Sequence, residues 1–180
     1  MAGAYGPATA VEPWTDRRRR AQELEERYPF AAELLRLYGA LLDVQEQAFH
    51  AARATRPPER TLARYIAERV LAEVIDVTVA QGPPRLREAA TERSRSEDRE
   101  ALVARWLKGD DQPAVDRYLA RASSAPVLEA LHEEATWAER GPRDGRHCPA
   151  CGGLPQLAYF SPSGDDLVTA PRRLLCSRCG

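Results

Sequence analysis

Every cysteine of this chain belongs to one of two Cys-x-x-Cys pairs in its last 40 residues. The pairs are Cys148/Cys151 and Cys176/Cys179, and 24 residues lie between them. In such a pair the backbone amides fold back on the first sulfur, so each pair forms a knuckle that supplies two thiolates. Two knuckles that face one another make a tetrahedral cage of four sulfur atoms. We therefore predict that the four cysteines bind one metal ion.

The segment between the two pairs has the pattern of a β-hairpin. Residues 155–160 are predicted to form a strand, residues 161–164 a turn, and residues 167–175 the returning strand. This hairpin would bring the second pair beside the first, as in a rubredoxin-like or zinc-ribbon module. Iron and zinc both accept four thiolates, so either metal fits, and no coordination position is left open for hydrolytic chemistry. His147 would then lie beside the cage or in solvent.

Two other states of the cysteines compete with a metal site: two redox-active dithiols, or two disulfides. Clustered cysteines in a reducing compartment bind metals more often than they form structural disulfides. Metal binding also contributes on the order of 10 kcal/mol to the folding of a module that is too small to build its own core. The four-cysteine metal site is therefore the favoured interpretation, with a structural clip as its simplest role.

Charge and length exclude several classes of protein. The 180 residues include 26 basic and 27 acidic side chains, which gives a net charge of −1. Phosphate binding normally requires a basic excess, so nucleic acid is not expected as a partner. No segment approaches the roughly 20 apolar residues of a membrane helix, so membrane insertion is not expected. Residues 1–14 lack the features of a secretory signal; they are expected to be disordered, and the protein to be cytoplasmic.

Glycine content divides the chain into two regions. Five of the eleven glycines lie in the first 140 residues and six in the last 40. We predict a helical bundle domain over residues 15–141 and a metal-binding ribbon over residues 142–180, so the fold class is mainly α with a small β-hairpin module. The polar segment Arg85–Ser96 is predicted to be a loop with a helical turn. Helices are expected at Thr15–Tyr28, from Pro29 onward, at Glu59–Ala80, at about Glu97–Lys108, at Pro113–Ala122 and at Ala125–Arg140.

Two of these helices carry a continuous apolar stripe that marks the core of the bundle. The stripe of the second helix comprises Phe30, Leu34, Leu37, Leu41, Val44 and Ala48. The stripe of the third helix comprises Leu62, Ile66, Val70, Val74 and Val77. Further core anchors are expected at Trp106, Tyr118, Leu131 and Trp137.

The helical region contains no recognisable catalytic constellation. His50 and His132 stand alone on helices, and there is neither a Gly-rich phosphate loop nor a serine elbow. The arginine run at residues 17–20 is followed by glutamates at helical spacing, so we interpret it as an ion-paired, solvated face rather than a nucleic-acid arm. We therefore do not expect an enzyme.

Two separated stretches resemble the formate dehydrogenase accessory protein family (FdhE type). The amino-terminal stretch comprises Arg20-Ala21-x-x-Leu24, Tyr-Pro-Phe-Ala-Ala-Glu-Leu-Leu-Arg-Leu-Tyr at residues 28–38, Leu41 and Gln45. The second stretch comprises the Cys-Pro-x-Cys-Gly knuckle at residues 148–152 and, after the hairpin, the knuckle at residues 176–180. Their order is similar to that of the family, in which a helical domain precedes rubredoxin-like segments. The resemblance covers the chain from about Arg17.

The resemblance implies a cytoplasmic maturation factor rather than an enzyme. Members of this family bind the catalytic subunit of formate dehydrogenase, are needed for its activity and carry iron in rubredoxin-type sites. Cys148, Cys151, Cys176 and Cys179 match the family's metal ligands, and no catalytic residue carries over. Family members usually continue into a second pair of knuckles, whereas this chain ends at Gly180 with one complete set of four cysteines. We therefore expect one metal centre and not two.

Two other functions stay open at this point. A thiol-redox factor would exchange electrons or disulfides with its client through the two cysteine pairs. A zinc-ribbon module would bind nucleic acid or another protein, although the net charge of −1 counts against nucleic acid. The sequence is also compatible with a homodimer, and it does not decide between iron and zinc.

Overall fold

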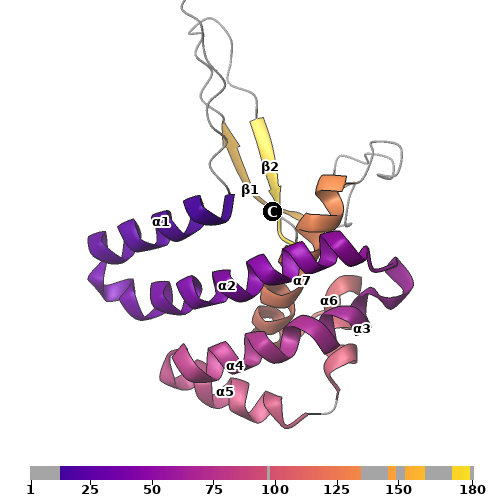
Figure 1. Ribbon diagram of the computed structural model, residues 1–180, viewed down its shortest axis with the longest axis horizontal. Coiled ribbons are helices and arrows are strands. Elements are labelled where there is room, and N and C mark those ends of the chain that lie inside the picture. The colour runs from indigo at the N-terminus through magenta and orange to yellow at the C-terminus, as the bar shows by residue number, and fades with distance from the viewer. Residues whose placement is uncertain (1–12, 97, 135–145, 149–152, 161–171, 179–180) are drawn as a thin grey trace, which may run out of the picture.

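The computed structural model describes residues 13–96, 98–134, 146–148, 153–160 and 172–178. They form a group of packed helices from which a two-stranded antiparallel sheet extends (Figure 1), which confirms the predicted mainly α class with a small sheet. The predicted domain boundary at Gly141 and Pro142, and the predicted anchor Trp137, lie outside the described residues. The helices are α1 (Pro13–Arg27), α2 (Ala32–Thr55), α3 (Leu62–Ile66), α4 (Ala72–Gln81), α5 (Pro84–Ser94), α6 (Arg99–Lys108) and α7 (Ala114–Glu134).

Helix α1 begins at Pro13, two residues before the predicted start at Thr15. Proline is tolerated in a first turn because its missing N–H would have no helical partner there. Trp14 is buried, and its ring meets Phe49 of α2 edge-on with 5.8 Å between centroids. The guanidinium of Arg17 lies 4.4 Å from the centre of the Trp14 ring. Trp14 therefore anchors α1 to α2, although it falls in the segment that was expected to be disordered.

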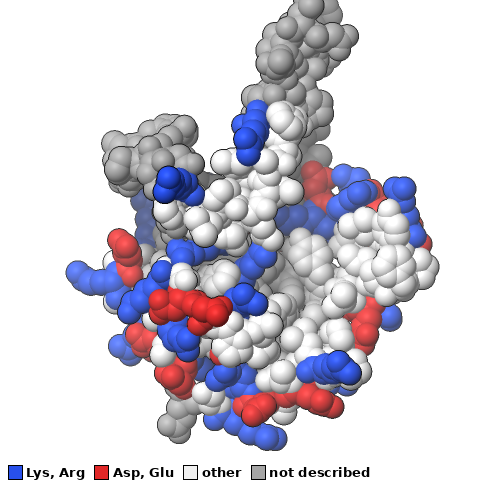
Figure 2. All heavy atoms as spheres, turned by 180° about the vertical axis from the view of Figure 1, so that it is seen from behind, with Lys and Arg blue, Asp and Glu red and all other residues white. Residues whose placement is uncertain are grey.

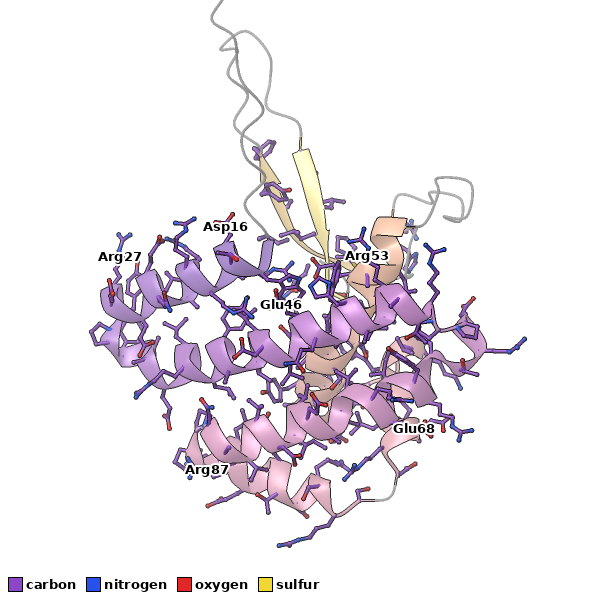
Figure 3. The ribbon with its side chains drawn as sticks, viewed as in Figure 1. Asp16, Arg27, Glu46, Arg53, Glu68 and Arg87 are labelled. Atoms are coloured by element: carbon purple, nitrogen blue, oxygen red, sulfur yellow. The ribbon has the colours of Figure 1, made fainter. Side chains whose placement is uncertain are left out.

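The arginine run of α1 forms ion pairs, as predicted, but half of it reaches other helices. The last two arginines of the run pair with acidic residues of α1 itself. Arg17 donates two hydrogen bonds, of 2.6 and 3.1 Å, to Glu129 of α7. Arg18 donates to two carboxylates of α2, and one of them, Glu46, lies on the side of α2 that faces α1 in Figure 3. These pairs fix the position of α1 relative to α2 and α7.

The apolar stripe of α2 is buried only in part. The predicted positions from Leu37 to Ala48 lie in the core. Leu34 is 58% exposed, and Phe30, in the 3₁₀ turn Pro29–Ala31 before α2, is 90% exposed. The prediction that these two residues belong to the core is therefore wrong. Helical periodicity identifies residues on a common face, but it does not say how far neighbouring helices cover that face.

The third predicted helix is present as one continuous helical rod from Leu62 to Gln81. A π-helical segment, Ala67–Leu71, joins α3 to α4 within it. The predicted core positions from Leu62 to Val74 are buried, and Val77 packs partly buried against the core. Gly82 ends the rod, and a Cβ at this position would come within 2.4 Å of the Thr78 carbonyl oxygen. The close approach explains why glycine stands at this helix end.

Helix α5 occupies residues that were predicted to form a loop with a helical turn, so the predicted loop is wrong and the turn is part of a full helix. Pro84 lies in its first turn, where proline favours helix initiation. Ala90 is the buried residue of this helix, and one buried position is too weak an apolar pattern to reveal a helix in the sequence. Arg93 donates to the Asp116 carboxylate of α7 at 2.6 Å, and Asp116 is only 5% exposed. This ion pair and packing against α4 hold α5 in place.

Residues 114–134 form one helix, α7, although two helices divided near Ser124 were predicted. Pro126 lies inside α7 and has no N–H to offer to the carbonyl of Ala122. The side chain of Gln45 on α2 supplies the missing donor, with its Nε2 atom 2.9 Å from the Ala122 carbonyl oxygen. Ser124 is buried within the helix and does not begin a new one. A side chain from another helix thus replaces the bond that the proline removes.

The sheet consists of β1 (Pro155–Phe160) and β2 (Arg172–Cys176), and the bounds of β1 agree with the predicted strand. The remainder of the predicted second strand, residues 167–171, lies outside the described residues. The register pairs Leu157 with Leu175, and an irregularity lies between Pro155 and Leu157. Every residue of β1 is exposed, so no described helix covers the hairpin. Among the helices that are described, none has the length and apolar character needed to cross a membrane.

Candidate metal centre

The hairpin brings the beginnings of the two cysteine knuckles to the same end of the sheet. Cys176 is the last residue of β2, and it pairs with the first residue of β1. Immediately before β1, the carbonyl of Gly153 accepts a hydrogen bond from the amide of Cys148 at 2.7 Å. The carbonyl of Leu154 accepts one from the amide of Ser177 at 2.9 Å. Backbone hydrogen bonds thus connect both knuckles to the same short segment of chain.

Gly153 lies directly against the sulfur of Cys176. A Cβ at this position would come within 2.6 Å of the Cys176 Sγ atom and within 3.0 Å of Cγ of Arg178. Such distances are shorter than real Cβ contacts, so only glycine fits without a shift of the second knuckle. Because the same glycine is bonded to the amide of Cys148, it allows the two knuckles to approach each other closely.

The second knuckle contains an amide-to-sulfur hydrogen bond. The N–H of Arg178, two residues after Cys176, donates to Cys176 Sγ at 3.4 Å. Thiolates that bind metals commonly accept such bonds from the surrounding chain, and these bonds orient the sulfur and tune the metal. Cys176 is 8% exposed and Cys148 is half-buried. The two sulfur atoms, the burial of Cys176 and the hydrogen bond from the Arg178 amide to its sulfur all fit a pair of metal-binding thiolates.

The predicted set of four ligands is placed only in part. Cys148 and Cys176 lie in the described residues, whereas Cys151 and Cys179 lie outside them. Within the described ranges, no three His, Cys, Asp or Glu side chains are grouped to hold a metal ion. His147 is exposed, one of the two positions expected for it. The four-sulfur cage stays a prediction, and its two described members fit it.

Described residues of the cysteine module contact the helical domain at several points. The guanidinium of Arg178 lies against Gly109 at the end of α6. Arg121 of α7 donates to Oε1 of Gln156 in β1 at 2.9 Å. Cys176 itself belongs to the hydrophobic core cluster of the helical domain, and Cys148 packs against that cluster. The knuckles therefore lie on the helices and are not a separate appendage.

Two hollows border the second knuckle, and neither was predicted from the sequence. A cavity of about 350 Å³ is lined by Arg121, Gln156, Leu157, Leu175 and Cys176. A larger groove of about 660 Å³ lies between α1, α2, α6 and α7, and Arg178 of the knuckle contributes to its wall. The sequence does show that Arg117 and Arg121 of α7 are four residues apart and therefore share a face of the helix. It does not show which other elements lie beside that face.

The two isolated histidines were expected to have no catalytic role. His50 is exposed, and its ring meets that of Phe49 edge-on with 5.4 Å between centroids. The contact is a packing interaction on the surface of α2. The side chain of His132 lies outside the described part of the chain.

Comparison of the chain with protein-family models, with curated proteins and with solved structures finds no match. The geometry of the knuckles, the surface beside them and the two sequence stretches described above are therefore the features that bear on function.

Proposed function

We propose that this protein is a cytoplasmic accessory factor that binds the catalytic subunit of a formate dehydrogenase and supports its maturation. The convergence of Cys148 and Cys176 at Gly153 is the observation that carries the proposal. It supports a rubredoxin-like module of the kind that the resembled family carries. The packing of this module on a helical domain agrees with the order of the two sequence stretches. The role is one of binding and not of catalysis.

The proposed metal site consists of Cys148, Cys151, Cys176 and Cys179 with one iron or zinc ion. When bound, the ion supplies a cross-link between the two knuckles, and iron in addition offers a one-electron redox couple. The chain itself contributes the amide of Arg178, which donates to Cys176 Sγ, and the burial of that sulfur against the helical core. These contacts would hold the second knuckle in place for its metal.

A docking role is supported by the surface around the module. The larger groove beside the second knuckle is lined by apolar and basic side chains from four helices, and the hairpin exposes Leu157, Phe160 and Leu174. Exposed apolar side chains gathered next to a shaped groove are typical of protein-binding surfaces. A client could thus contact the helices and the metal module together.

The metal content of the anaerobically purified protein tests the site. One iron per chain with thiolate charge-transfer bands, or one zinc per chain without colour, would support the cage. Cys148→Ser and Cys176→Ser should each lose the metal, while Ser177→Ala should retain it because its backbone amide still bonds to Leu154. A metal-free protein in which all four thiols react with a thiol reagent would contradict the cage and favour the thiol-redox alternative.

Co-purification with the catalytic subunit of formate dehydrogenase tests the partner. The wild-type chain and Ser177→Ala should retain the subunit, and the two cysteine variants should retain less of it. If the catalytic subunit does not bind a metal-loaded wild-type chain, the proposed partner is wrong even though the metal site stands.

A further inference from the structure

A groove of about 660 Å³ lies beside the second knuckle and is built from elements that are far apart in the sequence. Its lining comes from helices α1, α2, α6 and α7 and, through Arg178, from the knuckle. The residues that line it are Arg17, Tyr38, Leu41, Gln45, Trp106, Arg117, Tyr118, Arg121, Ala122, Ala125, Glu129 and Arg178. The groove is therefore a composite surface that requires both the helical domain and the cysteine module.

The charge of this groove differs from that of the whole chain. Its described lining holds four arginines and one glutamate, whereas the protein as a whole has a net charge of −1. Glu129 is already engaged in two hydrogen bonds from Arg17. Arg121 donates to the neutral amide of Gln156, and Arg117 lies 3.9 Å from a carboxylate oxygen of Asp111. Arg117 and Arg121 thus keep most of their positive charge, because neither is matched by a close carboxylate of the lining.

The carboxylate of Asp111 offsets the positive charge of Arg117 only weakly. The side chain of Asp111 is 97% exposed and that of Arg117 is 54% exposed. Ion pairs in such solvated positions contribute little and are easily exchanged. In the view of Figure 2, basic side chains gather around the base of the hairpin. A carboxylate from a partner could therefore replace the loose contact to Asp111 at little cost.

Between its charges the groove is apolar. Leu41, Ala122 and Ala125 contribute aliphatic surface, and Tyr38 and Trp106 contribute aromatic surface. Tyr38 is 41% exposed, so it is available both to the groove and to the surface beyond it. Aliphatic surface favours aliphatic side chains of a ligand, and the arginines around it favour carboxylates.

An exposed apolar stripe continues from the groove along α2. Tyr38 and Leu34 lie four residues apart on one side of α2, and Phe30 lies in the 3₁₀ turn that precedes the helix. They are 41%, 58% and 90% exposed. The corner between α1 and α2, at the right in Figure 2, accordingly shows uncharged side chains. The stripe lengthens the apolar floor of the groove into an extended surface.

We infer that the groove and this stripe bind an acidic segment of a partner polypeptide that carries leucine-like side chains at helical spacing. The acidic side chains would face Arg117 and Arg121, and the apolar ones would lie on Tyr38 and along the stripe toward Phe30. The inference rests on the proposed function in taking the partner to be a client protein, and it specifies the chemistry of the client segment. Positive charge combined with an apolar floor is the complement of such a segment.

A polypeptide fits this surface better than a nucleic acid does. Single-stranded nucleic acids are held by a basic groove with aromatic side chains on which bases stack. Here the lining also contains aliphatic side chains, and the exposed stripe beyond it adds Leu34 and Phe30. Such surface matches leucine-like side chains, which a polypeptide offers and a nucleic acid does not.

Arg178 makes the groove depend on the second knuckle. Its backbone amide donates to Cys176 Sγ, and its side chain reaches the groove and Gly109 of α6. One residue thus connects the cysteine site to the proposed docking surface. Arg178→Ala should therefore weaken binding of the segment as well as alter the knuckle, whereas Arg117→Ala should affect binding alone because its contact to Asp111 is exposed.

Three labelled peptides test the inference by fluorescence anisotropy with the full chain. The first has leucines at helical spacing separated by glutamates, and the others have glutamines or lysines in place of the glutamates. The glutamate peptide should bind tightest, and added salt should weaken its binding because the contacts are ionic. Arg117→Glu should lower its affinity roughly tenfold or more, since it reverses a charge that faces the ligand.

The matched control is Arg60→Glu, which reverses an exposed arginine that does not line the groove. It should leave the affinity unchanged, and Leu34→Ala should weaken binding without changing its salt dependence. Equal affinity for the three peptides, no binding of the glutamate peptide, or equal effects of Arg60→Glu and Arg117→Glu would overturn the inference. So would tighter binding of oligo(dT) that Arg117→Glu abolishes, because that result would assign the groove to nucleic acid.

The outcome can be separated from that of the proposed function. Peptide binding without co-purification of the formate dehydrogenase subunit would support the groove and contradict the proposed client. If Arg117→Glu still co-purifies with the subunit and the wild type binds no peptide, the inferred role of the groove is overturned and the proposed client is supported.

Discussion

The side chain of Arg178, in the second cysteine knuckle, lies against Gly109 at the end of α6. A Cβ on Gly109 would come within 2.7 Å of Nη2 of Arg178. Gly109 has a φ of +87°, the left-handed conformation that commonly ends a helix. A cation is also favourable near a helix carboxyl terminus, where carbonyl groups carry partial negative charge. The end of α6 is therefore shaped to receive the guanidinium of the knuckle.

Gly109→Ala should destabilise the protein and loosen this contact. An L-residue in the left-handed region costs on the order of 1–2 kcal/mol, and the added methyl group also displaces the end of the Arg178 side chain. Urea unfolding should show a loss of this size. Gly39→Ala is the matched control, because a Cβ there meets nothing within 4 Å and alanine in a helix is favoured by about 0.5–1 kcal/mol over glycine. If both substitutions have the same effect, Gly109 has no special role.

Gly153→Ala should weaken metal binding while the helices stay folded. The new methyl group would come within 2.6 Å of Cys176 Sγ, so the two knuckles could no longer approach each other in the same way. Competition with a chromophoric chelator would measure the metal affinity, and far-ultraviolet circular dichroism would check the helices. Ser177→Ala serves as a neighbouring control. An alanine variant that holds its metal as tightly as the wild type would contradict the position assigned to Gly153.

The local features of the cysteine module could be predicted from the sequence because they follow from short spacings. The bounds of β1 and the apposition of the two knuckles depend on two Cys-x-x-Cys turns and an alternating pattern between them. The contact between Arg178 and Gly109 joins residues 69 positions apart in the printed sequence, and no local pattern encodes it. The groove was missed for the same reason, since its walls come from four helices and the knuckle.

The helical domain shows where periodicity alone is insufficient. It identified the face of α2 that holds Leu37 and Leu41, but Phe30 and Leu34 share this spacing and are exposed. Helix α5 was missed because a single buried alanine and a long-range ion pair replace an apolar stripe. The sequence predicts a helix that begins at Ala125, because proline at position 126 is favoured in a first turn. Whether a helix passes through a proline depends on a donor from elsewhere, here Gln45.

Gln45→Leu should destabilise the protein by about 1–3 kcal/mol, because the carbonyl of Ala122 would lose its donor in a partly buried position. A double-mutant cycle with Pro126→Ala gives a sharper result. Alanine at position 126 restores a backbone N–H, so the carbonyl no longer depends on Gln45 and the cost of Gln45→Leu should fall. Urea unfolding of the four proteins measures the coupling. Equal costs in both backgrounds would show that Gln45 does not compensate for the proline.

The hydroxyl of Tyr118 forms a chain of hydrogen bonds that links α7 to α4. The Thr78 hydroxyl donates to the Val74 carbonyl at 2.6 Å, and the Tyr118 hydroxyl lies 2.9 Å from Thr78 Oγ1 and donates to it. Tyr118→Phe removes this last bond and should cost about 1 kcal/mol near neutral pH, measured by urea unfolding. Thr78 keeps its bond to Val74 in the variant, so the difference isolates the contribution of Tyr118.

The same pair of proteins should respond differently to alkaline pH. Burial raises the pKa of Tyr118 above its ordinary value. Tyr118 therefore ionises more easily in the unfolded chain than in the folded one. Its contribution to the unfolding free energy is complete below about pH 10 and is lost as the pH rises through the folded-state pKa. The variant lacks this group and should lose less stability over that range. The difference in unfolding free energy between the wild type and Tyr118→Phe should therefore become smaller above about pH 10. A difference that became larger would show that Tyr118 ionises more easily in the folded protein.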